Sequence, residues 1–65
     1  MKFNLFDKVT TQNMDGKYNN VPGKIIKVHT DVAFEPVYTV EYDIPIGSIT
    51  KGMFKESDLK LVNEN

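Results

Sequence analysis

The sequence contains no cysteine, no tryptophan and no arginine, and its single histidine is His29. Without cysteine there is neither a disulfide framework nor a thiolate metal cage, and this usage favours a cytoplasmic location. Without arginine the chain lacks the guanidinium groups that most often read phosphate and guanine. No apolar run approaches the ~20 residues of a membrane-spanning helix, and the first residues lack the apolar stretch of a secretory signal. The composition therefore predicts a cytoplasmic protein and gives no indication of a membrane partner.

A chain of 65 residues, 40% hydrophobic, is long enough for one small domain. Nearly every apolar residue must enter a single core, so we expect one domain over residues 1–65, with its core between about residue 3 and about residue 62. The formal net charge is −1, which is far from the basic balance of an electrostatic nucleic-acid binder. The abundance of lysine, asparagine and isoleucine is typical of an AT-rich coding genome, bacterial or phage.

Strand patterns dominate the chain, and no stretch of ten or more residues has a helical period. The clearest strand has Tyr38, Val40 and Tyr42 on one face and Thr39 and Glu41 on the other. Five strands are expected, at residues 7–12, 24–29, 37–43, 49–54 and 59–62. Because closing a sheet removes its exposed edges, the sequence predicts an all-β, five-stranded barrel.

Two long loops separate the first three expected strands, at residues 13–20 and 30–36. Asp15 and Gly16 form a pair suited to positive φ, which predicts a tight turn in the first loop. Pro22 and Gly23 have the chemistry of a second turn, because proline fixes φ and glycine accepts a positive value.

The second half of the chain has shorter connections. Residues 44–48 are expected to turn the chain, and Gly52 marks a bulge or bend in the following strand. Residues 55–58 are too few for an α-helix and predict a single 3₁₀ turn.

Conspicuous residues in several of these elements together resemble a known superfamily. They are Gly23, Ile25 and Val28, then Tyr38 and Val40, then Glu56, Ser57, Asp58 and Leu59. Their order is similar to that of the SH3-like small barrels, which include KOW and Tudor-like modules and many bacterial and phage proteins, and the resemblance covers most of residues 3–62. It implies a five-stranded SH3-like barrel with a 3₁₀ turn before the last strand. Because one fold hosts many functions, the resemblance implies binding of another macromolecule without naming it.

The chain departs from two members of that superfamily. It has neither tryptophan nor an Ala-Leu-Tyr-Asp-Tyr stretch, so it does not match the SH3 domains that bind proline-rich peptides. A Tudor-like aromatic cage would need exposed rings. Tyr38 and Tyr42 are expected in the core instead, which leaves Tyr18, Phe34 and Phe54.

The sequence gives no convincing catalytic group. His29 lies beside Asp31, which could serve as a base with an orienting carboxylate, but no nucleophile is associated with them and a solvent-facing strand end is the simpler interpretation. Ser48 and Ser57, the only serines, fall where turn chemistry explains them. We therefore expect that the protein is not an enzyme.

Acidic residues also fail to form a site. Glu41 and Asp43, like Glu56 and Asp58, have i,i+2 spacing and are interpreted as solvated edges. The run from Thr11 to Gly16 imitates the opening of a calcium loop, but proline stands at its twelfth position, where a bidentate glutamate is required. No metal and no cofactor are expected.

Tyr18 and Phe34 are aromatic residues placed in loops, where large rings often anchor interfaces. With Asp15 and Val32 they predict a protein partner held on a surface made by the two long loops. The protein would then be a binding module, such as a phage or mobile-element factor that modulates a host complex, or would self-associate. The competing hypothesis is that both rings fold back and cap the open ends of the barrel.

Lysines predict an alternative partner. Lys24, Lys27, Lys51 and Lys55 could align across neighbouring strands and follow the phosphates of RNA, as in a KOW-like module. The competing interpretation is that edge lysines keep the strands from pairing with other chains. The sequence leaves this choice open, and it predicts neither the partner's identity nor the oligomeric state.

Overall fold

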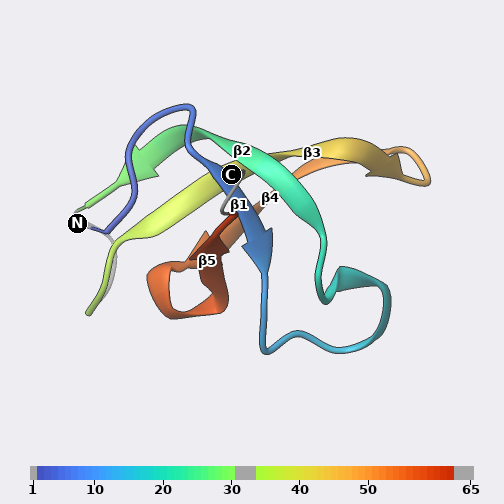
Figure 1. Ribbon diagram of the computed structural model, residues 1–65, viewed down its shortest axis with the longest axis horizontal. Helices are drawn as coiled ribbons and strands as arrows, with labels where there is room; N and C mark the ends of the chain where they lie inside the picture. The colour runs from blue at the N-terminus through green and yellow to red at the C-terminus, as the bar shows by residue number, and fades with distance from the viewer. Residues whose placement is uncertain (1, 31–33, 63–65) are drawn as a thin grey trace.

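The computed structural model describes residues 2–30 and 34–62 of the chain. It contains five strands, and two short 3₁₀ helices, η1 and η2, stand in the connections (Figure 1). The strands are β1 (Lys8–Thr11), β2 (Pro22–His29), β3 (Val37–Ile46), β4 (Ile49–Lys55) and β5 (Leu59–Leu61), and the 3₁₀ helices are η1 (Gly16–Tyr18) and η2 (Glu56–Asp58).

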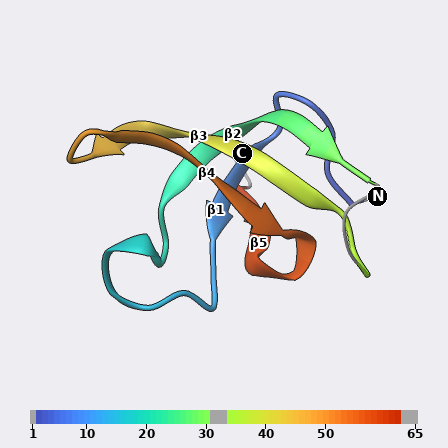
Figure 2. The same cartoon turned by 180° about the vertical axis from the view of Figure 1, so that it is seen from behind.

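All five strands belong to one antiparallel sheet with the order β4-β3-β2-β1-β5. Figures 1 and 2 show β2, β3 and β4 running across the view, with β1 turned steeply to them. The all-β prediction is therefore confirmed. No ladder joins β4 to β5 among the residues that the structure describes, so the sheet is not closed.

The core lies on the inner face of this bent sheet. Alternation places Tyr38, Val40 and Tyr42 inside, as the sequence predicts, and the ring of Phe3 packs edge-on against Tyr38 at a centroid distance of 5.3 Å. The buried apolar residues are Phe3, Val9, Val21, Ile25, Tyr38, Val40, Tyr42, Phe54 and Leu59.

The predicted turn at Pro22 and Gly23 is wrong, because both residues belong to β2. Proline is tolerated as the first residue of a strand. Gly23 is buried, and a Cβ there would lie 2.5 Å from the carbonyl oxygen of Glu41 and 2.6 Å from Val40 Cγ1. The glycine is thus needed for close approach of two strands and not for a positive φ.

The first long connection contains η1 where a tight turn was predicted, and Gly16 does adopt a positive φ of 59°. Thr11 anchors this connection to the sheet although it is a fully buried polar residue. Its hydroxyl donates to the carbonyl oxygen of Tyr18 at 2.6 Å and accepts from the N–H of Val21 at 2.9 Å. Both hydrogen-bonding capacities are used, so its burial is not penalised by an unpaired polar group.

The hairpin of β3 and β4 is longer than predicted. Its turn is Gly47 and Ser48, with φ of 62° at Gly47, so residues 44–46 continue β3 instead of turning the chain. The ladder with β2 ends at Tyr42, and Pro45 therefore lies where β2 requires no hydrogen bond from it. Figure 1 shows the hairpin projecting beyond the other strands.

Gly52 is not a bulge, because it pairs in regular register with Val40. Irregular pairing lies elsewhere, at Ile26 in β2 and in β3 between Glu41 and Ile46. A side chain at Gly52 would instead collide with the hydroxyl of Tyr42. The predicted 3₁₀ turn before the last strand is confirmed as η2.

Candidate partner-binding face

The described parts of the two long loops do not form one surface. One precedes β2 and the other follows it, and successive connections of an antiparallel meander lie at opposite ends of the strand they share. The eight residues of β2 separate them by roughly 25 Å at about 3.3 Å per residue. A recognition surface shared by Tyr18 and Phe34 is therefore wrong for this fold.

Tyr18 and Asp15 remain together at the first connection. Asp15 is exposed and directly precedes η1, while Tyr18 is half-buried, with the ammonium of Lys17 5.5 Å from its ring centroid. The partial burial of Tyr18 is compatible with the predicted capping role, and only the exposed part of its ring could contact a partner.

Phe34 lies at the opposite end and is fully exposed, at 111% of its reference area. The competing hypothesis that its ring caps the barrel is therefore wrong for this residue. Val32, which the sequence pairs with Phe34 as a contact, lies outside the described residues, as does Asp31. His29 is half-buried in β2, where its Nε2 lies 2.9 Å from the hydroxyl oxygen of Thr39.

The four lysines of the alternative hypothesis lie on one face of the sheet. Directly opposite residues of an antiparallel pair share a face, and Glu41 stands opposite both Lys24 and Lys51. In the next row Thr39 stands opposite both Lys27 and Met53. The third row consists of His29 in β2, Val37 in β3 and Lys55 in β4. We call the outward side chains of these rows, together with Lys8 and Asp43, the basic face.

Lys8 extends the basic face into β1, since it stands opposite Lys24. Its side chain extends across β2, and its Nζ lies 2.7 Å from Oδ1 of Asp43 in β3. Both side chains are more than a third exposed, so this ion pair contributes little to stability and mainly fixes the position of one positive charge.

Charge is segregated between this face and the other described residues. The basic face has five lysines and two carboxylates, a net charge of +3, although the whole sequence has a net charge of −1. The other described residues have three lysines and five carboxylates, a net charge of −2. The nearly neutral composition therefore gives no sign of the positive face, which becomes apparent only when the pairing of the strands is known.

Lys24 does not protect a sheet edge, because it pairs with Lys8 of β1 on one side and with Glu41 of β3 on the other. Lys27 lies beyond the ladder with β1 and pairs with β3 alone. The interpretation that lysines shield an edge therefore applies to Lys27, Lys51 and Lys55 and not to Lys24.

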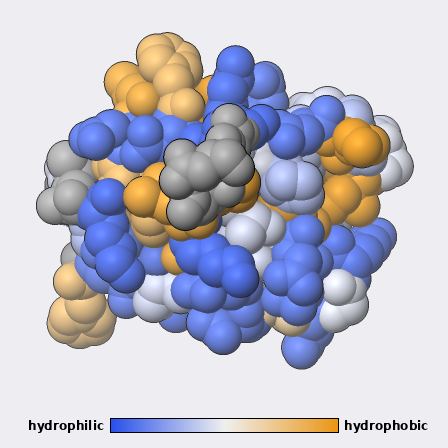
Figure 3. All heavy atoms as spheres, viewed as in Figure 1, coloured by the Kyte–Doolittle hydropathy of each residue, from blue (hydrophilic) through white to orange (hydrophobic). Residues whose placement is uncertain are grey.

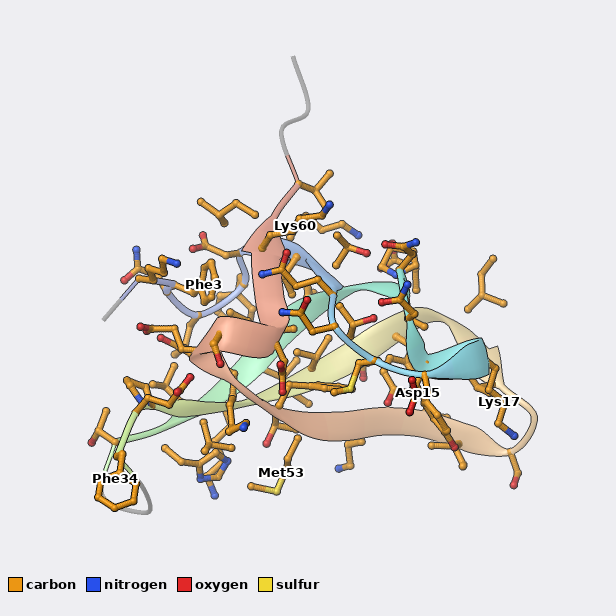
Figure 4. The ribbon with its side chains drawn as sticks, turned by 90° about the horizontal axis from the view of Figure 1, so that it is seen from below. Phe3, Asp15, Lys17, Phe34, Met53 and Lys60 are labelled. Carbon is orange, nitrogen blue, oxygen red and sulfur yellow. The ribbon has the colours of Figure 1, made fainter. Side chains whose placement is uncertain are left out.

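Met53 lies in the second of the three rows of the basic face, on the edge strand β4, and is 59% exposed. Figure 4 shows the side chains of Met53 and Phe34 on the same side of the sheet, opposite to Phe3 and Lys60. The face thus combines lysines with an adaptable apolar side chain and has an exposed ring at one end.

Carboxylates near η2 turn toward the backbone and away from the basic face. Glu56 accepts hydrogen bonds at 2.9 Å from the N–H of Lys2 and at 2.7 Å from the hydroxyl of Tyr38, and these two donors lower its pKa. Glu35 accepts from the N–H of Ser57 at 2.7 Å, which lowers the pKa of Glu35. Burial, followed by the hydrogen bond to Glu56, raises the pKa of Tyr38. These groups hold elements together and are not free for a partner.

Other apolar side chains are exposed away from the basic face. On the face shown in Figure 3, orange apolar groups form separate patches between blue hydrophilic ones. The largest of the exposed fractions after that of Phe34 belong to Ile44, at 76%, and Phe6, at 69%. Sequence reasoning missed Ile44, because residues 44–48 looked like a turn and not like the end of a projecting strand.

The described residues contain no group of three or more side chains that could together hold a metal ion. Over the same residues, no helix has the length and apolar character needed to cross a bilayer.

Comparison of the chain with protein-family models, with curated proteins and with solved structures gives no match.

Proposed function

We propose that the protein is a binding module that holds a protein partner of acidic character on the basic face. The observation that supports this proposal is the charge segregation, with five lysines on a face whose only carboxylates are Glu41 and Asp43. Complementary charge speeds encounter with an acidic partner and suppresses unsuitable ones. Phe34 and Met53 would supply the apolar contacts that such a surface needs near its lysines.

A protein suits this face better than a nucleic acid for two reasons. Glu41 lies directly between Lys24 and Lys51, where a phosphate backbone would meet a negative charge. Successive bases would need rings to stack on, but the three rows of the face contain only the imidazole of His29, and the exposed ring of Phe34 lies at the end of the face. An acidic polypeptide can place its carboxylates beside the lysines and avoid Glu41.

A KOW-like module that binds RNA is the second candidate function. It is favoured by the position of Lys24, Lys27, Lys51 and Lys55 on one face. Binding through four phosphates of a single strand would make the affinity fall with salt at a logarithmic slope of about −3.

The fold itself supports a more specific proposal, that the sheet is an open form of the SH3-like barrel. The order β4-β3-β2-β1-β5 is a meander whose last strand returns to pair with the first, and η2 stands immediately before that strand. The resemblance in the sequence implies five strands with a 3₁₀ turn before the last one, and the presence of these two features supports the proposal.

Affinity capture from the lysate of a bacterium with an AT-rich genome, with and without nuclease, tests the function. We expect a specific acidic protein to remain bound after nuclease treatment. Recovery that disappears with nuclease, together with steep salt-dependent binding of a single-stranded oligonucleotide, would replace the proposal with the RNA-binding candidate.

A further inference from the structure

The outer edge of β4 is the longest unpaired edge of the sheet. β4 pairs with β3 on one side, and no other backbone hydrogen bond involves residues 49–55 among the described residues. In an antiparallel strand every second residue directs its N–H and C=O to the free side. The opposite edge, β5, has only three residues and so offers a much shorter template.

The exposed side chains of β4 alternate in character along this edge. Ile49, Lys51, Met53 and Lys55 are all exposed, whereas Phe54 between the last two is buried. Because residues two apart share a face of a strand, these four side chains form a row that reads apolar, basic, apolar, basic. A strand added here would meet this row with its own alternating side chains.

A second copy of the chain is a poor occupant of this edge. Antiparallel pairing of two β4 strands would bring Lys51 and Lys55 of both copies onto the same face of neighbouring strands, where like charges repel. An extended segment with carboxylates opposite the lysines and apolar side chains opposite Ile49 and Met53 has no such conflict. Charge complementarity therefore selects a different chain of acidic character.

We propose that β4 accepts an extended acidic segment of the protein partner as an additional strand of the sheet. The inference rests on the proposed function and specifies how the partner is held. Main-chain hydrogen bonds would give the affinity, and alternate side chains would give the specificity. The basic face continues from Lys51 and Lys55 to Lys27 and Lys24, so that the rest of the partner would lie over β2 and β3.

The test uses a synthetic heptapeptide, Glu-Thr-Val-Thr-Glu-Thr-Val, whose antiparallel register places its glutamates opposite Lys55 and Lys51. Amide chemical shifts of ¹⁵N-labelled protein are followed during titration to about 1 mM peptide. We expect shift changes concentrated on residues 49–55, with slower exchange of the outward amides of β4. A heptapeptide with lysine in place of both glutamates should bind at least about tenfold more weakly.

Matched variants separate charge from folding. Lys51→Glu combined with Lys55→Glu should weaken peptide binding by at least about tenfold, while Lys60→Glu combined with Lys17→Glu, with the same change in net charge, should leave it within about twofold. N-methylation of alternate peptide amides removes donors without altering the protein. N-methylation of the amides on the peptide edge that pairs with β4 should abolish binding, whereas N-methylation on the opposite edge should have little effect.

The inference is overturned if the peptide causes no shifts by about 1 mM, if the shifts fall on other strands, or if the lysine peptide binds equally well. These failures are distinct from failure of the proposed function. If an acidic partner is still captured after nuclease treatment but the peptide does not shift the amide signals of β4, the proposed function stands and the proposal of an added strand is wrong. If no protein is captured after nuclease treatment, the proposed function itself is wrong.

Discussion

The hydroxyl of Tyr38 donates a 2.7 Å hydrogen bond to Oε2 of Glu56, and the same oxygen accepts from the N–H of Lys2 at 2.9 Å. One carboxylate oxygen thus joins the middle of the sheet, the 3₁₀ turn before the last strand and the amino-terminal segment. This junction holds the carboxylate away from the basic face and helps to keep that face positive.

Tyr38→Phe should destabilise the fold by about 1.5–3 kcal/mol, because the ring is retained while a hydrogen bond to a carboxylate is lost. Chemical denaturation measures this change in the free energy of unfolding. Tyr18→Phe is the matched control, since its hydroxyl has no hydrogen-bond partner within the described residues, and it should change stability by less than about 0.5 kcal/mol. Equal losses in the two variants would contradict the role given to the junction.

Acid should weaken the fold through Glu56. Its pKa in the folded chain is lowered from the ordinary value of 4.5 by the N–H of Lys2 and the hydroxyl of Tyr38. A lowered pKa contributes stability that is present above the unfolded value and is lost as the pH falls through the folded value. Denaturation between pH 7 and strongly acidic conditions should show the free energy of unfolding falling below about pH 4.5. Glu56→Gln should flatten that fall, and an unchanged acid slope would contradict the assignment.

Two glycines should differ in their tolerance of alanine. At Gly23 the added Cβ would meet backbone, 2.5 Å from the carbonyl oxygen of Glu41, so Gly23→Ala should cost about 1–3 kcal/mol or more. At Gly52 the nearest obstacle is the terminal hydroxyl of Tyr42, which can move, so Gly52→Ala should cost less. Thermal denaturation of both variants checks the order, and a Gly23→Ala protein as stable as the parent would show that the two strands are less closely packed.

Phe34→Ala should leave the free energy of unfolding within about 0.5 kcal/mol of the parent, because the ring is fully exposed. The same variant should weaken partner binding if the ring lies at the end of the interface. Tyr18→Ala should reduce stability more, since Tyr18 is half-buried. Unfolding of the Phe34 variant would revive the capping hypothesis.

The sequence predicts the strands well and their connections less well. Alternation around Tyr38, Val40 and Tyr42 identifies the core strand, because burial of one face leaves a period of two in the sequence. Turn predictions based on proline and glycine are wrong where packing between strands, and not the local sequence, decides the backbone conformation. The sequence predicts a turn at residues 44–48, but Pro45 lies within β3, where β2 no longer pairs. It also predicts a turn at Gly23, which instead allows the close approach of two strands.

The candidate face could be predicted only in part. The four lysines were recognised as a set, but whether they share a face depends on strand register, and the bulge at Ile26 shifts Lys27 into line with Thr39. The placement of Tyr18 and Phe34 at opposite ends follows from the antiparallel order of the strands alone, so it could have been predicted from the sequence. The charge segregation could not be predicted without the strand pairing, because acids and lysines are interspersed along the sequence.

The measurement that tests the account most directly is capture of the partner from nuclease-treated lysate by two charge-reversed proteins. One combines Lys24→Glu with Lys27→Glu on the basic face, and the other combines Lys17→Glu with Lys60→Glu away from it, so that both have the same net charge. The account predicts at least about tenfold less partner on the first protein and an unchanged amount on the second. Equal retention by both proteins would contradict a partner-binding role for the basic face.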